Sequence, residues 1–497
     1  MEPYKVCYIS AEVAPFAKTF RSRGLADTSK ALPIALKEVE QDIRLMMPKY
    51  KSINERKYVL REVIRLREVN LDLGGETKSA NGKTAFLPNS KVHVYFLSVP
   101  EYFDRKGFYK DPQTGKDQPD NAERFAHFCK AALETLKLLY WQPDIIHCSD
   151  WATSFIPYFL KTHYKDDEFF EGTRTVLTVH NIKEQGIFPL KTASKIGISD
   201  EFVAPGKPFE LKGKLNLLKG GLAFADIINT VSEHFANELL SNPKSASQGL
   251  EEIIGQRKKD IFGVLSGVDY LAWDPETDKN IPVQYESKTL SKKLENKVEL
   301  CRELDFTANK DIPLIAMMSD LSDEKETKII ADVLADLAKK KVQIVVIGNG
   351  ESEHQAPINE LAKAHSEKFA FFERFDNRLS HMLIAGADMI FIPTETMSGG
   401  LSHLCSLRYG TVPIVREIGV LADSIKKFDS DTGKGTGFVF SDLKKTVIMK
   451  AINEALKTFK DAKSWSKIQK SGMRADFSWE TTSRKYLKLY EKALKKR

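Results

Sequence analysis

The residues best suited to bind a ligand follow short apolar segments of the chain. Lys18, Thr19 and Gly24 follow the apolar residues 5–10 and precede a run with helical character. Glycine lacks a Cβ atom, so backbone N–H groups beside it can approach an anionic group or a sugar closely. The pattern therefore indicates either a ligand-binding turn or an ordinary loop between a strand and a helix, and both interpretations remain open.

Two further glycine clusters occur at comparable positions. Gly399 and Gly400 precede Leu401, where residues 401–407 are expected to form a helix. The N–H groups at such a helix start can bind a diphosphate, although a plain helix start explains these residues equally well. Gly348 opens a Gly-Asn-Gly sequence after the apolar residues 342–347, and we expect a turn there.

Two series of short apolar, β-rich segments are expected to position these residues. The first series comprises residues 5–10, 43–47, 92–97, 144–148, 175–179 and 226–231. The second comprises residues 313–318, 342–347, 369–372, 388–392 and 412–415, with a candidate helix at 325–339. Apolar runs that alternate with helices predict buried parallel strands, because the helices cover both faces of the sheet. The fold class is therefore α/β, with two similar halves.

The predicted domains are residues 1–265 and residues 266–476. Gly267, Asp269 and Pro275 supply turn residues between the two series of strands. Residues 477–497 are expected to form a C-terminal helix that packs back on the N-terminal domain, because apolar residues recur there at helical spacing. In folds of this type, ligands bind beyond the carboxyl ends of the strands.

Length and composition exclude several classes of protein. The 497 residues exceed the size of one ordinary domain, and 42% hydrophobic with 29% charged residues is typical of a globular protein. A net charge of +7 from 75 basic and 68 acidic residues does not predict nucleic-acid binding. Five widely spaced cysteines predict reduced thiols in the core rather than disulfides or a metal site. No segment is long and apolar enough to predict a membrane helix, so we expect no membrane partner and a cytoplasmic protein.

Short motifs in a particular order give the chain its family resemblance. They are Lys18-Thr19, Gly24 to Asp27, Asp120-Asn121, residues 143–147, Asp150-Trp151, His180-Asn181, Gly267 to Asp269, residues 385–388, residues 408–413 and residues 476–479. Each motif alone is unspecific, but their order and spacing resemble bacterial glycogen synthases and plant starch synthases over nearly the whole chain.

The resemblance implies a fold and an activity. The fold is of the GT-B type, in which two Rossmann-like domains face each other across a cleft, with the acceptor on the N-terminal side and the nucleotide sugar on the C-terminal side. The activity is transfer of glucose from ADP-glucose, or a related nucleotide sugar, to an α-1,4-glucan with retention of configuration. No cofactor and no metal is implied, and the expected ligands are the nucleotide sugar and the glucan.

The resemblance also implies which residues form the site. The candidate catalytic residues are His180 and Lys325, which match family motifs, and Glu395, which lies two residues from the position of the family glutamate and is a candidate replacement for it. The candidate ligand-binding residues are Lys18, Thr19, Gly24, Gly348, Gly399, Gly400 and Leu401. Lys325 matches a family lysine that binds the diphosphate, because fixed cations stabilise the negative charge that glycosyl cleavage leaves on the nucleotide.

Several positions depart from the family pattern. Residues 20–23, Phe-Arg-Ser-Arg, replace one glycine of the first loop. Ala152 stands where the family has a histidine that hydrogen-bonds the transferred glucose, and Asp320 stands where it has an arginine. Met397 and Gly399 replace a glutamate and a cysteine of the family. A methyl group or a thioether cannot supply the lost hydrogen bonds and charge.

Three hypotheses follow from these departures. In the first, the chain is an active glucosyltransferase of the family. In the second, it is a relative without catalysis that binds glucan or a partner synthase as a regulator or scaffold. A third possibility is a site rebuilt for another donor, in which Arg21 or Arg23 supplies the missing cation and Glu395 the missing carboxylate.

Overall fold

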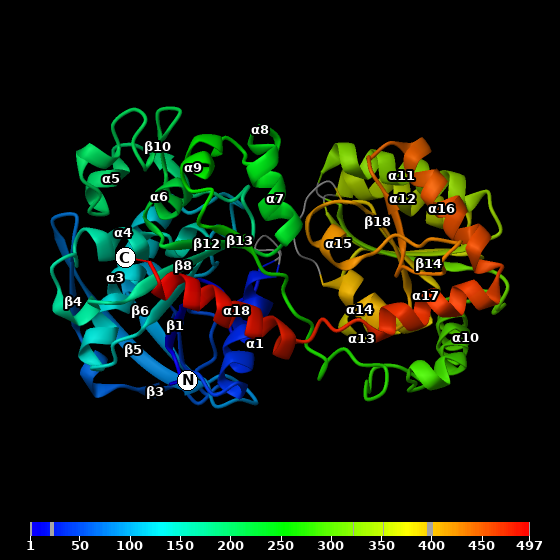
Figure 1. Ribbon diagram of the computed structural model, residues 1–497, viewed down its shortest axis with the longest axis horizontal. Helices are drawn as coiled ribbons and strands as arrows, with labels where there is room; N and C mark the ends of the chain where they lie inside the picture. Colours follow the sequence, from blue (N-terminus) through cyan, green and yellow to red (C-terminus); the bar gives the residue numbers. More distant parts are fainter. Residues whose placement is uncertain (1, 20–23, 322, 351, 395–400, 497) are drawn as a thin grey trace. The chain divides into compact units, whose positions relative to one another are not determined.

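The computed structural model describes residues 2–19, 24–321, 323–350, 352–394 and 401–496. The chain divides into two compact units (Figure 1). Unit 1 comprises Met1–Gly267 together with Trp479–Arg497, and unit 2 comprises Val268–Ser478. Each unit is an α/β structure on a largely parallel sheet, which confirms the predicted fold class.

Unit 1 is built, within the described residues, on a ten-stranded sheet in the order β13-β12-β8-β7-β1-β2-β6-β5-β3, with β4 paired to β5. The strands from β13 to β6 are parallel. They are β1 (Lys5–Ile9), β2 (Asp42–Pro48), β6 (His93–Ser98), β7 (Ile145–Ser149), β8 (Arg174–Val179), β12 (Ile227–Thr230) and β13 (Ile261–Gly263). All six strands predicted for the first series are therefore confirmed, because continuous apolar runs mark strands that are buried on both faces.

The antiparallel part of unit 1 was not predicted from the sequence. It comprises β3 (Arg61–Glu62), β4 (Val69–Leu73) and β5 (Glu76–Phe86), and a separate small sheet comprises β9 (Ile187–Pro189), β10 (Glu210–Leu211) and β11 (Lys214–Asn216). Strand β5 is mostly exposed or half-buried, and Ala80 and Gly82 are its buried residues. Such a polar strand lacks the apolar run that predicted the others.

The helices of unit 1 cover its parallel sheet. They are α1 (Leu25–Glu38), α2 (Pro100–Phe103), α3 (Asn121–Leu138), α4 (Phe155–Lys161), α5 (Thr192–Lys195), α6 (Leu217–Phe224), α7 (Glu233–Ser241), α8 (Pro243–Ala246), α9 (Glu251–Gln256) and α18 (Trp479–Leu494). In α1, Leu25, Leu32 and Leu36 are buried at helical spacing and form the face that packs inward.

The C-terminal helix α18 belongs to unit 1, where it packs against α1 and strands β7, β8 and β12. Its buried tyrosines form hydrogen bonds with the sheet. Tyr490 Oη lies 2.8 Å from His147 Nδ1, and Asn229 Nδ2 donates to Tyr486 Oη over 3.3 Å. These bonds fix the helix on the sheet in addition to its apolar contacts.

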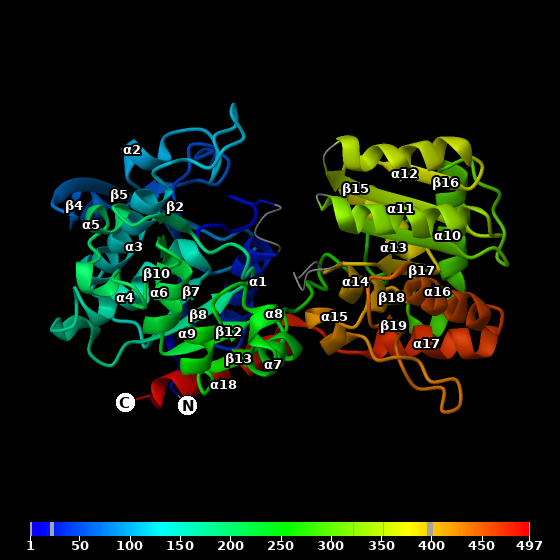
Figure 2. The same cartoon turned by 90° about the horizontal axis from the view of Figure 1, so that it is seen from above.

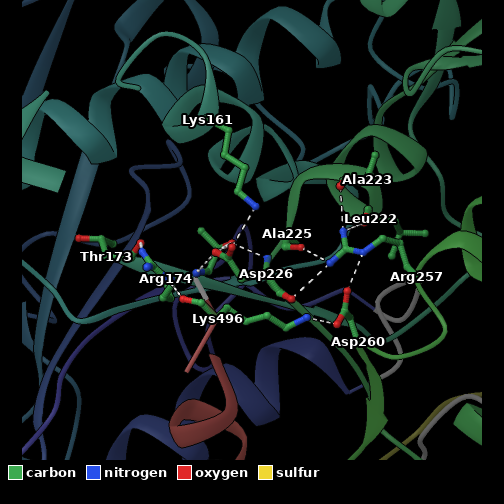
Figure 3. A network of polar contacts seen from close by, with 11 residues as sticks. Lys161, Thr173, Arg174, Leu222, Ala223, Ala225, Asp226, Arg257, Asp260 and Lys496 are labelled. Carbon is green, nitrogen blue, oxygen red and sulfur yellow. Dashed lines mark hydrogen bonds and ion pairs between the residues drawn. The ribbon is translucent and has the colours of Figure 1, made fainter. Parts of the chain in front are cut away.

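A polar network at the starts of β8, β12 and β13 holds the end of the chain (Figure 3). Arg174 Nε donates to the Lys496 carbonyl over 3.0 Å, and the Lys496 ammonium group pairs with Asp260. Asp260 also pairs with Arg257, 3.0 Å away. The Arg257 guanidinium donates to the carbonyl groups that end α6 and follow it, those of Leu222, Ala223, Ala225 and Asp226. One arginine thus caps α6 and joins it to the C-terminal residues.

Unit 2 contains, in the described residues, six parallel strands in the order β16-β15-β14-β17-β18-β19. They are β14 (Leu314–Leu321), β15 (Gln343–Gly350), β16 (Phe369–Phe372), β17 (Met389–Ile392), β18 (Val412–Arg416) and β19 (Phe438–Phe440). The five strands of the second predicted series are confirmed, and β19 is an additional edge strand.

Helices cover both faces of the unit 2 sheet (Figure 2). They are α10 (Lys293–Glu303), α11 (Glu324–Ala338), α12 (Ser352–Ala364), α13 (Asn377–Gly386), α14 (Ser402–Arg408), α15 (Gly419–Ser424), α16 (Lys445–Phe459) and α17 (Ala462–Arg474). Alternate residues of one strand face opposite layers: Ile315 and Met317 pack in the larger core with α11 and α16, whereas Leu314 and Ala316 pack with α10 and α13. Helix α11 confirms the helix predicted at residues 325–339.

The turn predicted at Gly348 is wrong. Strand β15 continues through Gly350, and Gly348 and Gly350 pair in register with Ser319 and Leu321 of β14. A Cβ atom on Gly348 would lie 2.5 Å from Leu321 Cδ1, and one on Gly350 would lie 2.5 Å from the Leu321 carbonyl oxygen. Both glycines are thus required by the close approach of Leu321 rather than by a turn.

Candidate active site

In each unit, the strand order reverses at one place in the sheet. In unit 1 the chain adds β2 and β6 on one side of β1 and then β7, β8 and β12 on the other. In unit 2 it adds β15 and β16 on one side of β14 and then β17, β18 and β19 on the other. Ligands of open α/β sheets bind at the carboxyl ends of the strands at such a reversal. The chain segments that follow β1, β7, β14 and β17 are therefore the places to examine.

The structure places those predicted site residues that it describes near these strand ends. In unit 1, Lys18, Thr19 and Gly24 follow β1, and His180 follows β8, which pairs with β7. In unit 2, Lys325 follows β14, Gly348 lies near the end of β15, and Leu401 follows β17. Glu395, Met397, Gly399, Gly400 and residues 20–23 lie outside the described residues.

Glu12 organises the loop after β1. Its side chain is fully buried and accepts hydrogen bonds from Thr19 N over 2.5 Å and from Thr19 Oγ1 over 2.9 Å. Burial raises the pKa of the Tyr109 hydroxyl well above its usual value, and the nearby Glu12 charge raises it further. The Thr19 hydroxyl is therefore directed to a carboxylate of its own loop. Sequence reasoning did not identify Glu12 as a site residue, because only the folded loop brings residues 12, 19 and 109 together.

Lys18 and Gly24 flank this loop. The Lys18 ammonium group contacts both carboxylate oxygens of Asp27, at 2.9 and 2.8 Å, and both side chains are substantially exposed. Gly24 is the N-cap residue of α1 and has φ of +97°, a left-handed conformation that glycine adopts without strain. To bind an anionic ligand, Lys18 would have to break its ion pair with Asp27 or contact both Asp27 and the ligand.

Asp150 is the functional candidate that the sequence did not single out. It follows β7 directly, is buried, and has φ of +57°. Its Oδ1 atom accepts hydrogen bonds from the backbone N–H groups of His180, at 2.7 Å, and Asn181, at 3.4 Å. Burial raises the pKa of Asp150 to about 7, and the charges of Glu12 and Glu184 act in the same direction, whereas the two N–H groups oppose the rise. The available sequence signal is its position immediately after a buried strand.

His180 is buried beside Asp150 at the end of β8. Burial lowers the pKa of its imidazole to about 3, so the ring is neutral at physiological pH. Within the described residues, its Nε2 atom has no hydrogen-bond partner. A buried polar atom usually has one, so this nitrogen is available to a ligand.

Trp151 and Ala152 complete the strand end. The Trp151 ring packs against the rings of Phe125 and Phe188, with ring centroids 5.2 Å and 5.9 Å apart. Gly186, with φ of +62°, leaves room for it, because a Cβ atom there would lie 2.6 Å from Trp151 Cε3. Ala152 is buried and contributes only a methyl group and its backbone.

His147 is a hydrogen-bonded core residue. Its Nδ1 atom bonds to Tyr490 as described above, and its Nε2 atom lies 2.6 Å from Thr178 Oγ1. Burial lowers the pKa of His147 to about 3. Both ring nitrogens are occupied, so His147 cannot replace a ligand-binding histidine. The five cysteines are confirmed as free and buried.

In unit 2, two helices begin at the strand ends that flank the reversal. Asp323 is the N-cap residue of α11, where its side chain accepts from Glu326 N over 2.9 Å, and the exposed Lys325 lies in the first turn. Leu401 is the N-cap residue of α14 and gives no side-chain hydrogen bond to it. The first N–H groups of α14 are therefore not capped by that residue. Asp320 lies in β14, opposite Asn349.

The described part of the chain contains neither a candidate metal-ligating cluster nor a candidate membrane span. Those residues include no cluster of three or more histidine, cysteine or acidic side chains that could hold a metal ion. The same residues include no helix with the length and apolar character needed to span a membrane.

Comparison with known proteins gives matches over the whole chain. Residues 5–256 match the family described as "Starch synthase catalytic domain", and residues 304–471 match "Glycosyl transferases group 1". The chain is 35% identical to the glycogen synthase of Desulforudis audaxviator (strain MP104C), over 99% of this chain and 97% of that protein. It is 36% identical to glycogen synthase 2 of Geobacter sulfurreducens, over 98% and 99% of the two chains. Among solved structures, the catalytic domain of starch synthase IV from Arabidopsis thaliana, bound to ADP and acarbose, matches with a TM-score of 0.88 and 26% identity over 100% of both chains.

Proposed function

Because this chain belongs to the glycogen and starch synthase family of glycosyltransferases, we propose that it transfers glucose from ADP-glucose to the non-reducing end of an α-1,4-glucan with retention of configuration. The relatives that match over full length are glycogen synthases, and the matching solved structure is a starch synthase bound to ADP. The nucleotide sugar and the glucan are substrates in this proposal.

The observation that carries the proposal is the buried pair of Asp150 and His180 at the strand reversal of unit 1. Neutral His180 offers Nε2 to a hydroxyl group of the transferred sugar. Asp150 accepts the His180 N–H and so fixes the position of that residue at the end of β8. A side chain held by the backbone of a rigid strand keeps its geometry during reaction, which is the condition for stabilising a transition state.

Unit 2 supplies groups for the departing nucleotide. Glycosyl cleavage leaves negative charge on the diphosphate, and positive groups lower the free energy of that state. Lys325 is an exposed cation in the first turn of α11, and the start of α14 presents N–H groups with no side-chain cap from Leu401. In this proposal both interact with the diphosphate.

A second candidate function is favoured by one feature of unit 1. Ala152 is buried at the position where the family resemblance implies a sugar-binding histidine, and Lys18 is engaged by Asp27. With these groups lost or occupied, the chain would bind glucan without transferring glucose. Asp320 and Met397 replace charged residues of the family pattern, and these replacements also favour the second candidate function.

The two functions are separated by one experiment. Purified protein is incubated with glycogen and either ADP-glucose or UDP-glucose, and the released nucleotide is measured over time. The proposal predicts release that requires glycogen and is lost in His180→Ala. The matched control is His163→Ala, which changes an exposed histidine whose Nε2 atom bonds to the Gly197 carbonyl away from the strand reversal.

The absence of nucleotide release from a folded sample would refute transfer from these donors. Sedimentation of the protein with glycogen would then identify a glucan-binding protein. A thermal-shift screen of other nucleotide sugars would identify a site rebuilt for another donor, because a ligand of the folded state raises the unfolding midpoint.

A further inference from the structure

The positive charge of the chain is concentrated at its C-terminal end. Residues 441–497 contain 16 basic and 6 acidic residues, a net charge of +10, whereas the whole chain has a net charge of +7. Residues 1–440 therefore carry a net charge of −3. Three helices occupy this C-terminal region: α16 and α17 in unit 2, and α18 in unit 1.

Helix α17 differs from the other two because it contains no acidic residue. Glu454 lies in α16, and Glu480 and Glu491 lie in α18, where Glu480 pairs with Arg484 at 3.0 Å. The basic residues of α17 are Lys463, Lys467, Lys470 and Arg474. Along the sequence of this helix, nothing neutralises these four charges.

The four basic residues form a single line on the helix surface, which we call the α17 cationic line. Their spacing is i, i+4, i+7 and i+11, and a rotation of 100° per residue places all four within an arc of about 60°. The line is about 16 Å long. The opposite side of the helix packs inward through Trp465, Ile468 and Met473. Figures 1 and 2 show α17 at the edge of unit 2.

Most of the line is exposed, and it has no ion-pair partner within the described ranges. Lys463, Lys467 and Arg474 are exposed and Lys470 is half-buried. None of the four forms an ion pair with any residue that the structure describes. By contrast, Lys444 and Lys445 at the start of α16 pair with Asp442, at 2.7 Å, and Asp336, at 2.8 Å.

The neighbouring acidic groups Asp461 and Asp429 accept backbone hydrogen bonds, and Asp461 also interacts electrostatically with Lys463. Asp461 caps α17 and accepts from the backbone N–H groups of Lys463 and Ser464. Beside the line, Lys467 lies near Gly433, and Asp429 of that loop accepts the backbone N–H groups of Asp431 and Thr432. Like charges three and four residues apart destabilise a helix. The α17 cationic line therefore opposes helix stability, and among the described residues the Asp461 charge acts on Lys463 at one end of the line.

We propose that the α17 cationic line is a docking surface for an acidic helical segment of a partner protein. Carboxylates at the same helical spacing would each face one cation, and pairing would relieve the repulsion along α17. The chemistry of the line is less suited to other polyanions. Trp465 is buried, so the helix offers no aromatic surface for nucleic-acid bases. Its apolar residues face the core, so it has none to insert into a membrane.

The test uses the full-length protein and a fluorescein-labelled synthetic helix with glutamates at i, i+4, i+7 and i+11. A second peptide has the same composition with the glutamates distributed around the helix. Fluorescence anisotropy measures the affinity of both. The variant K463Q/K467Q/K470Q/R474Q removes the line. The control variant K310Q/K328Q/K341Q/K363Q removes four exposed lysines elsewhere in unit 2 and changes the net charge equally.

We expect the line variant to bind the matched peptide at least about tenfold more weakly than the unmodified protein. The affinity of the control variant for the same peptide should change by less than about twofold. Binding should weaken as salt rises from about 0.05 to 0.3 M. The line variant should unfold at the same or a higher temperature, because repulsion is removed, so a loss of binding cannot come from misfolding.

Three results would overturn the proposal. The first is no measurable binding of the matched peptide at low salt, and the second is equal weakening in the two variants. The third is a preference, dependent on these four residues, for phosphatidylserine vesicles or single-stranded DNA over the matched peptide, which would assign the line to a lipid surface or to nucleic acid.

Discussion

Replacement of Asp150 by asparagine should make the protein more stable. Asparagine has the same shape, tolerates a positive φ, and keeps an oxygen to accept the His180 N–H. It removes the carboxylate charge, which is costly because Asp150 is buried at the end of β7 and its pKa is raised to about 7.

The expected magnitude follows from the pKa shift. The pKa rises from the ordinary 3.8 to about 7, and each unit corresponds to about 1.4 kcal/mol, so the ionised form costs the fold about 4 kcal/mol. A neutral acceptor forms a weaker bond to the His180 N–H, by about 1 kcal/mol. We therefore expect Asp150→Asn to raise the free energy of unfolding by about 2 to 3 kcal/mol at pH 8, or the unfolding midpoint by about 5 °C.

The free energy of unfolding should depend on pH because Asp150 has different pKa values in the folded and unfolded states. Between pH 3.8 and about 7 the unfolded chain loses the Asp150 proton while the folded chain keeps it. The unfolded state is thereby favoured, and stability falls as pH rises through this window. The advantage of Asp150→Asn should therefore be largest at pH 8 and should shrink toward pH 4.

Thermal unfolding from about pH 4 to pH 8 measures the effect. The control is Asp388→Asn, which should lower the midpoint, because Asp388 pairs with Lys297 at 2.7 Å and accepts the Leu314 N–H at 2.8 Å. A lower midpoint for Asp150→Asn at pH 8, or a difference that does not depend on pH, would refute the reasoning.

Three further substitutions test other parts of the account. Gly186→Ala should destabilise unit 1 by about 2 to 4 kcal/mol and reduce activity, because the new Cβ would lie 2.6 Å from Trp151 Cε3; chemical denaturation measures it, and an unchanged midpoint would contradict it. Burial lowers the pKa of Lys293 to about 7, so the free energy of unfolding should rise with pH between about 7 and 10.5, where only the unfolded chain remains protonated. Lys293→Met should abolish that rise in urea titrations, and an unaltered slope would argue against it. Arg257→Met should cost about 3 kcal/mol, since it uncaps α6 and breaks the pair with Asp260; hydrogen exchange of α6 and α18 should increase, and unchanged protection of both helices would count against the capping role.

Much of the architecture could be predicted from the sequence. Buried parallel strands such as β1 and β14 are continuous apolar runs, so their positions were visible without the structure. The GT-B class implied by the resemblance is confirmed by two parallel-sheet units and by the structural match to a starch synthase. Strand β5 was missed because its side chains are mostly polar, and its place depends on contacts such as that of Gly82 with Leu66.

The candidate site was less accessible to sequence reasoning. His180 could be chosen from its motif, but the lack of a partner for its Nε2 atom among the described residues is a property of the folded core. Asp150 was missed because its positive φ and raised pKa arise from burial between β7 and β8. Gly348 was misinterpreted as part of a turn, because a glycine required by a close neighbouring strand has the same sequence pattern as one required by chain reversal.

The central claim is tested most directly by following radiolabelled glucose from ADP-glucose into glycogen. The account predicts that the label becomes covalently bound to the glucan, that β-amylase releases it as maltose, and that incorporation is lost in His180→Ala but kept in His163→Ala. A folded protein that incorporates no label, or label that β-amylase does not release, would contradict the proposed transfer.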